Sequence, residues 1–120
     1  MNDKKVIWIT GASSGIGRSL ALKFAKEGWI VAASARRENL LQKLHSENEN
    51  IHSFPLDVTN DVKCKNVFNN ILKQFENIEI CVFATGIHDP KSEKKFNLEK
   101  IRKIFEVNYF GIMNSINAIY

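Results

Sequence analysis

The sequence of 120 residues is 44% hydrophobic and 25% charged, and its formal net charge is +4. These values are ordinary for a globular domain, and a chain of this length buries about two thirds of its surface. No hydrophobic run approaches the ~20 residues that span a bilayer, and the short apolar stretch after the first five residues does not resemble a secretion signal. We therefore expect one soluble, cytoplasmic domain with no membrane partner.

Much of the excess positive charge lies between Lys91 and Lys103. Such a run can attract nucleic acid or an anionic membrane, but a solvated helix face explains it more simply, so we expect no nucleic-acid partner. Cys81 lies in an apolar strand-like run and Cys64 in a helical pattern, and both are expected to be buried or half-buried thiols in a reducing compartment. The three histidines are scattered, without His or Cys neighbours at ligand spacing, so no metal site is predicted.

Short apolar runs alternate with amphipathic helical patterns along the whole chain. The expected strands are Val6–Ile9, Ile30–Ala33, Ile51–Leu56 and Ile78–Ala84. The first expected helix begins at Ile16 and is ended by Gly28, and the second contains Leu40–Leu44 and ends in the polar residues 46–50. The third runs from Cys64 to Phe75. The last runs from Leu98 to about Ala118, with Asn97 as its N-cap. This βαβαβαβα order predicts a single α/β domain with a parallel sheet and right-handed crossovers.

The first expected strand runs directly into a glycine-rich loop at the start of a helix. A helix N-terminus carries unpaired N–H groups and about half a positive charge, and glycines let the backbone approach a phosphate closely. We expect this loop to bind the diphosphate of a dinucleotide; the alternative is a flexible turn without a ligand. A nucleoside-triphosphate loop is excluded because Ala12 and Arg18 stand where that loop needs Gly and Lys. The expected binding residues are Gly11, Ser13, Ser14, Gly15, Ile16 and Gly17.

Residues 10–17, "TGASSGIG", resemble the diagnostic motif of the short-chain dehydrogenase/reductase family, and the resemblance extends along the whole chain. It implies a Rossmann-type parallel sheet of strand order 3-2-1-4 that ends before a fifth strand, with residues 1–120 as an NADP-binding domain. It also implies an oxidoreductase that transfers hydride between a nicotinamide and a small alcohol or carbonyl substrate. Family members are commonly oligomeric, so a homo-oligomer is expected for the complete protein.

The residues after the second expected strand bear on which nicotinamide cofactor binds. Ala35 falls where NAD-preferring family members carry an acidic residue, and Arg36 and Arg37 follow. A guanidinium can bind the 2′-phosphate of NADP(H) with paired hydrogen bonds, and the Ser13 hydroxyl can add a donor. The sequence therefore favours NADP(H) over NAD(H). In the alternative interpretation the arginines only solvate the start of the next helix, which does not explain the missing acid.

Two further segments resemble cofactor-contacting segments of the family. Asp57 and Val58 match the pair that contacts adenine, although Asp57 alone is also typical of a turn or an N-cap. Phe83-Ala84-Thr85-Gly86 stands where the family has Asn-Asn-Ala-Gly, so the asparagine that braces the sheet is replaced by Ala84. The resemblance still implies that Ala84 and Gly86 bring backbone close to the cofactor ribose.

Asn108 is a polar residue on the apolar stripe of the last expected helix. It lies four residues from both Ile104 and Ile112, so the spacing predicts that it is buried and hydrogen-bonded, and a satisfied core asparagine is one interpretation. "EVNYFG", residues 106–111, resembles the family's V-N-x-x-G segment. The resemblance implies that Asn108 distorts the helix and holds a water on a proton relay to a catalytic lysine, and Gly111 indicates tight packing. The other apolar members of this stripe are Ile101, Phe105 and Ile116.

The catalytic serine and the Tyr-x-x-x-Lys pair of the family have no counterpart in these residues. Tyr109 is followed four residues later by Met113, Tyr120 is the last residue, and Ser115 lies in a helix rather than in the catalytic element. We therefore expect the N-terminal half of an oxidoreductase, inactive and prone to association by itself. A non-catalytic dinucleotide-binding module or a regulatory relative remains the alternative, and an epimerase or dehydratase is a third.

Overall fold

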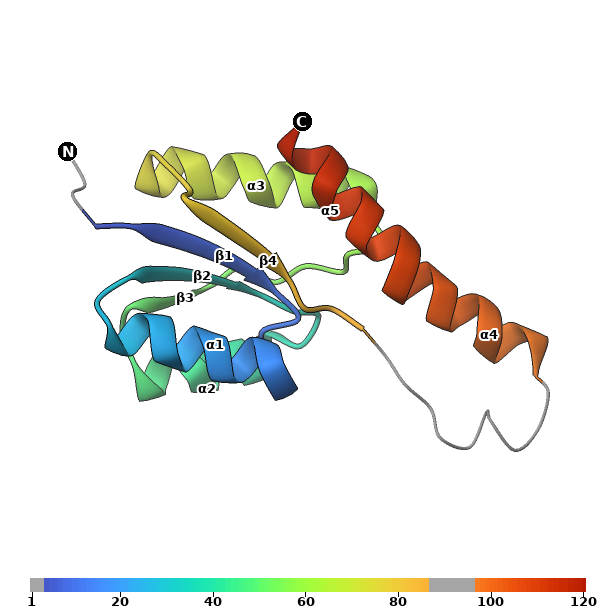
Figure 1. The fold of residues 1–120 in the computed structure, drawn as a ribbon, viewed down its shortest axis with the longest axis horizontal. Helices are drawn as coiled ribbons and strands as arrows, with labels where there is room; N and C mark the ends of the chain where they lie inside the picture. Colours follow the sequence, from blue (N-terminus) through green and yellow to red (C-terminus); the bar gives the residue numbers. More distant parts are fainter. Residues whose placement is uncertain (1–3, 87–96) are drawn as a thin grey trace.

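A computed structural model describes residues 4–86 and 97–120, which fold as a parallel sheet with helices on both faces (Figure 1). The strands are β1 (Val6–Thr10), β2 (Ile30–Ser34), β3 (Ile51–Ser53) and β4 (Ile80–Phe83). The helices are α1 (Gly15–Lys26), α2 (Glu38–Glu47), α3 (Asp61–Phe75), α4 (Leu98–Phe105), the π-helical turn η2 (Glu106–Phe110) and α5 (Gly111–Ile119). In the described ranges, no helix combines the length and the apolar character that a bilayer crossing requires.

The sheet has the strand order β3-β2-β1-β4, as predicted for a Rossmann-type α/β fold. All neighbouring strands are parallel: Val6 of β1 is opposite Ile30 of β2, and Thr10 is opposite Phe83 of β4. Every residue of β1 and β2 is buried, because helices cover both faces of these central strands. This double cover accounts for continuous apolar runs where a half-exposed strand would alternate.

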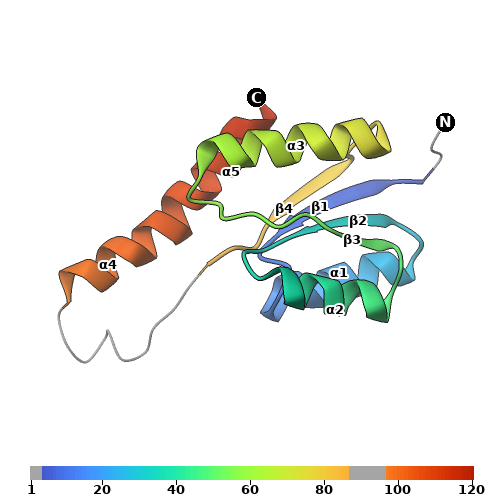
Figure 2. The same cartoon turned by 180° about the vertical axis from the view of Figure 1, so that it is seen from behind.

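The core consists of two layers, one on each face of the sheet. Ile7 and Ile9 of β1 pack toward α1 and α2, where small Ala21 and Ala25 allow α1 to approach closely. Trp8 points to the opposite face and packs beneath α3, its ring centroid 6.0 Å from that of Phe68 and 6.0 Å from that of Phe83. Figures 1 and 2 show these layers from opposite sides, with α1 and α2 on one face and α3 and α5 on the other.

Two strands are shorter than their apolar runs predict. β3 ends at Ser53, although the N–H groups of Phe54 and Leu56 still donate to Ala33 and Ala35 at 2.9 Å. The intervening Pro55 interrupts neither bond, because β3 is an edge strand and only alternate residues, here Phe54 and Leu56, donate toward β2. β4 covers Ile80–Phe83 rather than 78–84, with single flanking hydrogen bonds beyond each end.

The expected single helix from Leu98 to about Ala118 is interrupted by η2. Its predicted start is confirmed, since the Asn97 side chain accepts from the Lys100 N–H at 3.1 Å. The predicted buried stripe is wrong: no residue of α4 is buried, and Phe105 is 59% exposed. The cause is twofold, because α4 extends beyond the sheet in both views and because the π turn shifts the helical phase. The residues buried beyond α4 are Val107, Gly111 and Ser115.

The turn from β1 into α1 requires glycine at two positions. Gly11 has φ +71°, and a Cβ there would lie 2.6 Å from backbone atoms of Ala84 and Thr85. A Cβ on Gly17 would lie 2.1 Å from the Gly11 carbonyl oxygen. The first turn of α1 is therefore packed directly on the loop, and the loop directly on the end of β4.

We expect Gly17→Ala to destabilise the fold more than Gly15→Ala. Gly15 has φ +56° with open space around it, so alanine there costs only the left-handed strain of about 1–2 kcal/mol. Alanine at position 17 must displace backbone, and we expect a loss of at least about 3 kcal/mol. Urea unfolding of both variants measures the difference, and equal losses would contradict the packing described above.

The edge strand β3 carries a histidine that the fold keeps neutral. His52 packs on Phe75 with ring centroids 5.0 Å apart, and its ring centroid is 6.1 Å from that of His45. Burial, followed by repulsion from His45 and Lys4, lowers the pKa of His52 below its ordinary value of 6.5. In acid the unfolded chain therefore binds more protons than the folded protein.

Because of this difference, the free energy of unfolding should fall as the pH drops below about 6.5. Glutamine cannot take up a proton in this range, so His52→Gln should make the free energy of unfolding depend less on pH between 7.5 and 5.5. Urea unfolding at these two pH values, for the wild-type protein and the variant, makes the measurement. An unchanged slope in the variant would assign the acid sensitivity to other groups.

Candidate functional site

A cavity lies at the carboxyl edge of the sheet, where β1 has β2 on one side and β4 on the other. The chain therefore leaves the sheet in opposite directions at this point, which is where open α/β sheets bind ligands. The loop after β1, the end of β2, the segment after β3 and the end of β4 form its walls, together with η2. The lining residues are Gly11, Ser13, Ser14, Ser34, Ala35, Arg36, Arg37, Leu56, Asp57, Val58, Ala84, Thr85, Gly86 and Val107.

The glycine loop presents the start of α1 to this cavity. Ser14 is the N-cap residue, but its side chain makes no capping hydrogen bond, and the first turn of α1 carries no acidic residue. The partial positive charge of the helix start is therefore not neutralised from within the helix. Gly11, Ser13 and Ser14 line the cavity, whereas Gly15, Ile16 and Gly17 form the first turn of α1 and are not among its lining residues.

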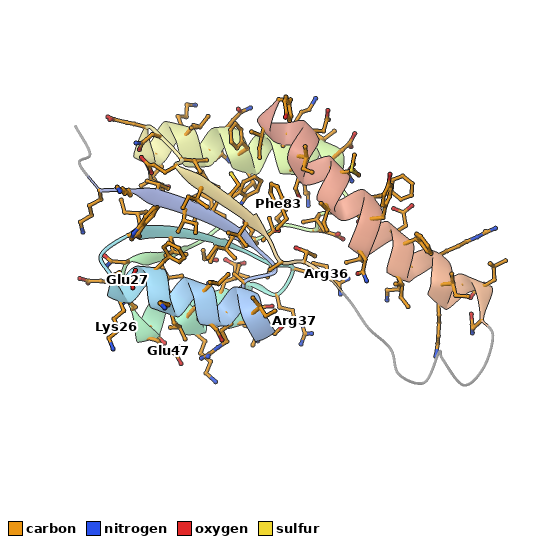
Figure 3. All side chains as sticks on the ribbon, viewed as in Figure 1. Lys26, Glu27, Arg36, Arg37, Glu47 and Phe83 are labelled. Atoms are coloured by element: carbon orange, nitrogen blue, oxygen red, sulfur yellow. The ribbon has the colours of Figure 1, made fainter. Side chains whose placement is uncertain are left out.

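Arg36 and Arg37 stand exposed at the mouth of the cavity, two and three residues after the end of β2 (Figure 3). Arg37 also precedes α2, and its carbonyl oxygen accepts the first N–H bonds of that helix. Arg18, by contrast, is paired with Glu47 of α2 by two contacts of 2.9 Å. The cations at the cavity mouth are therefore Arg36 and Arg37, and the Ala35 side chain beside them supplies no carboxylate.

Asp57 is held at the cavity wall by a local turn. Its Oδ1 accepts from the Thr59 hydroxyl at 2.7 Å and from the Thr59 N–H at 3.0 Å. The bond from the Thr59 side chain lowers the pKa of Asp57, with smaller contributions from the Thr59 N–H, Arg36 and Lys63, against an opposing effect of burial. Asp57 is thus an ionised turn residue as well as a cavity residue, while Asn60 is the N-cap of α3.

Asn108 lies in the π turn beside the end of β4. A Cβ on Gly86 would lie 3.5 Å from its Oδ1, so the amide side chain faces Gly86. Asn108 is half-buried and does not itself line the cavity, whereas its neighbour Val107 does. The helix distortion expected at this asparagine is present as η2.

Sequence reasoning named no binding role for several residues that line the cavity. Ser34 ends β2, and its hydroxyl oxygen accepts from the Trp8 indole N–H at 2.9 Å in the core. Thr85 follows β4, and its Oγ1 is buried with no hydrogen-bond partner among the described residues. A signal was available for these residues and for Leu56 and Val107, because each directly neighbours a predicted site residue or ends a strand.

The cavity combines a helix start, two cations and one carboxylate, so its chemistry fits a ligand with phosphates and a hydrogen-bonding base. At Gly11 and Gly17 a side chain would fill the turn, and its absence lets the backbone approach such a ligand closely. Within residues 4–86 and 97–120, no three His, Cys, Asp or Glu residues are grouped as a metal site would need. His88, Pro90 and the first part of the basic run lie outside these ranges.

Comparison with known proteins identifies the family that residues 10–17 resemble, and the match extends along nearly the whole chain. The profile of the short chain dehydrogenase family matches residues 5–120. A dehydrogenase/reductase SDR family protein 7-like protein of Dictyostelium discoideum is 33% identical, over 97% of this chain and 40% of its own length. The human dehydrogenase/reductase SDR family member 7 is also 33% identical, over 95% of this chain and 36% of its own.

Solved structures share the architecture as well. ElxO with NADP bound is 28% identical with a TM-score of 0.85, covering 97% of this chain and 49% of that one. A 3-ketoacyl-(acyl-carrier-protein) reductase of Brucella melitensis, complexed with NADH, is 26% identical with a TM-score of 0.84, covering 94% and 47%. The chain thus spans half or less of the length of these proteins. Its sequence, strand order and glycine turn together establish that it belongs to the short-chain dehydrogenase family.

Proposed function

We propose that residues 1–120 form the NADP(H)-binding domain of an oxidoreductase that transfers hydride between the nicotinamide and a small alcohol or carbonyl substrate. The observation that carries this proposal is the cavity mouth, where Arg36 and Arg37 follow β2 and Ala35 stands in place of an acid. A 2′-phosphate brings about two negative charges, which this arrangement attracts and a carboxylate would repel. Solved relatives include both an NADP-bound and an NADH-bound protein, so this choice depends on the residues of this chain.

The diphosphate of the cofactor is proposed to lie on the glycine loop. Ser13 and Ser14 line the cavity with hydroxyl groups, and Gly11 brings the main chain close to it. Gly15, Ile16 and Gly17 contribute through the backbone of the first helical turn, whose N–H groups attract anions whether or not their side chains face the ligand.

The adenosine end is proposed to lie between the arginines and the segment after β3. Arg36 and Arg37 bind the 2′-phosphate, with a further donor from the Ser13 hydroxyl. Asp57 accepts from the adenine amino group, which its ionised state favours, and Val58 contacts the ring. Ala84 and Gly86 contact the ribose through their backbone. These roles agree with the lining of the cavity and with the lowered pKa of Asp57.

Catalysis in this family uses a serine and a Tyr-x-x-x-Lys pair, which these 120 residues do not contain. The bound cofactor would supply the hydride chemistry, and this chain would bind and orient it. Asn108 is proposed to hold the proton-relay water through its main chain, because it lies in a π turn, and such turns within α-helices are frequent at functional sites. By this account the chain alone is inactive, and the complete protein is a homo-oligomer.

A non-catalytic dinucleotide-binding module is the second candidate, because the described residues by themselves form the cavity proposed for the cofactor. Both candidates require cofactor binding, so an activity assay separates them. Carbonyl-dependent oxidation of NADPH by the product of the complete gene supports the oxidoreductase. Tight NADPH binding without turnover of any alcohol or carbonyl substrate supports the module.

We expect NADPH to bind more tightly than NADH, and Arg36→Leu to weaken NADPH binding by about 10- to 100-fold because a charge-assisted bond to phosphate is lost. NADH binding should change little in this variant. Arg18→Leu is the matched control, because this arginine is paired with Glu47 and lies outside the cavity lining. Isothermal titration calorimetry gives each dissociation constant.

The same measurement on the double variant Ala35→Asp/Arg36→Leu should show NADH preferred, since a carboxylate now accepts from the ribose 2′-hydroxyl and repels phosphate. A wild-type protein that prefers NADH would overturn the choice of cofactor. A folded wild-type protein that binds neither dinucleotide would overturn the proposed function.

A further inference from the structure

One backbone carbonyl in the wall of the cavity is held by side chains from two helices. The Val58 carbonyl oxygen accepts from Asn114 Nδ2 of α5 at 3.0 Å and from Cys64 Sγ of α3 at 3.7 Å. A thiol is a weak donor, so the amide of Asn114 makes the stronger of the two bonds. Cys64 is buried, and burial raises the pKa of its thiol, which keeps the S–H proton in place.

The side chain of the same residue rests on α5. A Cβ on Gly111 would lie 2.5 Å from Val58 Cγ2, so glycine at that position is what lets Val58 pack against the helix. Val58 is thus held against α5 through its side chain at Gly111 and through its carbonyl at Asn114, three residues further along the helix.

The peptide between Val58 and Thr59 extends this contact to the carboxylate of Asp57. Its C=O accepts from Asn114, and its N–H, on Thr59, donates to Asp57 Oδ1 at 3.0 Å. A peptide unit is planar, so the direction of its C=O fixes the direction of its N–H. The amide of Asn114 therefore sets the orientation of the N–H group that holds the Asp57 carboxylate.

We infer that Asn114 is a positioning residue for the adenosine end of the cofactor, acting through the Val58–Thr59 peptide on Asp57. This inference rests on the proposed function, because it requires that Asp57 and Val58 contact the cofactor. It also makes α5 a shared support: the helix follows directly on η2, which carries Asn108, and it holds the adenine segment through Asn114.

Asn114→Leu tests the inference, because it removes the donor while keeping a side chain of similar size. Asn117→Leu is the matched control, since Asn117 lies on the same helix and is exposed. The probe is 2′,5′-ADP, which contains only the adenosine end of NADP(H), titrated calorimetrically well below the unfolding temperature. We expect the dissociation constant to rise about three- to tenfold in Asn114→Leu, with no change in Asn117→Leu.

Asn114→Asp is the second variant, in case leucine prevents folding: it keeps the shape but offers an acceptor to the Val58 carbonyl. Amide hydrogen exchange at Thr59 is a readout that needs no ligand, and it should become faster in both variants at position 114. A lower unfolding temperature with unchanged binding of 2′,5′-ADP and unchanged Thr59 exchange would make Asn114 merely structural and overturn the inference. A wild-type protein that does not bind 2′,5′-ADP would overturn the proposed function, and the inference with it.

Discussion

The contact between Gly17 and the carbonyl oxygen of Gly11 is the constraint on which the site depends. With no side chain between them, the first turn of α1 rests on the loop that leaves β1, and the loop rests on the backbone after β4. Three segments that are distant in the sequence are thereby brought together at one edge of the sheet. The helix start and the ends of β1 and β4 meet there because each glycine removes the atom that would separate them.

Positive charge exceeds negative charge around this edge of the sheet, which favours the binding of an anion. The helix start is not neutralised by an acid in its own first turn, and two arginines follow β2 where an acid would repel phosphate. The carboxylate of Asp57 accepts a hydrogen bond from Thr59, and this bond stabilises the ionised form of Asp57. The arginines at the cavity mouth are not the main source of that stabilisation. Arg18, in the first part of α1, is instead paired with Glu47 of α2.

The opposite wall is built by packing rather than by charge. Val58 lies on Gly111, and its carbonyl accepts from Asn114 and Cys64, so α3 and α5 together support the segment that follows β3. The π turn before α5 lets Asn108 face Gly86 while Val107 lines the cavity. A π turn contains one residue more between bonded groups than an α-helical turn, so the residues of α5 are rotated relative to those of α4.

The sequence by itself determined the order of strands and helices, their parallel arrangement and the location of the glycine turn, because apolar periodicity and glycine spacing are local properties of the chain. It also indicated Arg36, Asp57 and Gly86, which stand one to three residues after an expected strand. The tertiary structure decided where β3 ends, that α4 buries none of its residues, and that Asn114 holds a carbonyl 56 positions away in the sequence. It likewise brought Ser34 and Thr85 into the cavity wall. These features depend on which backbone and side-chain atoms meet across the sheet, and no local spacing specifies such a meeting.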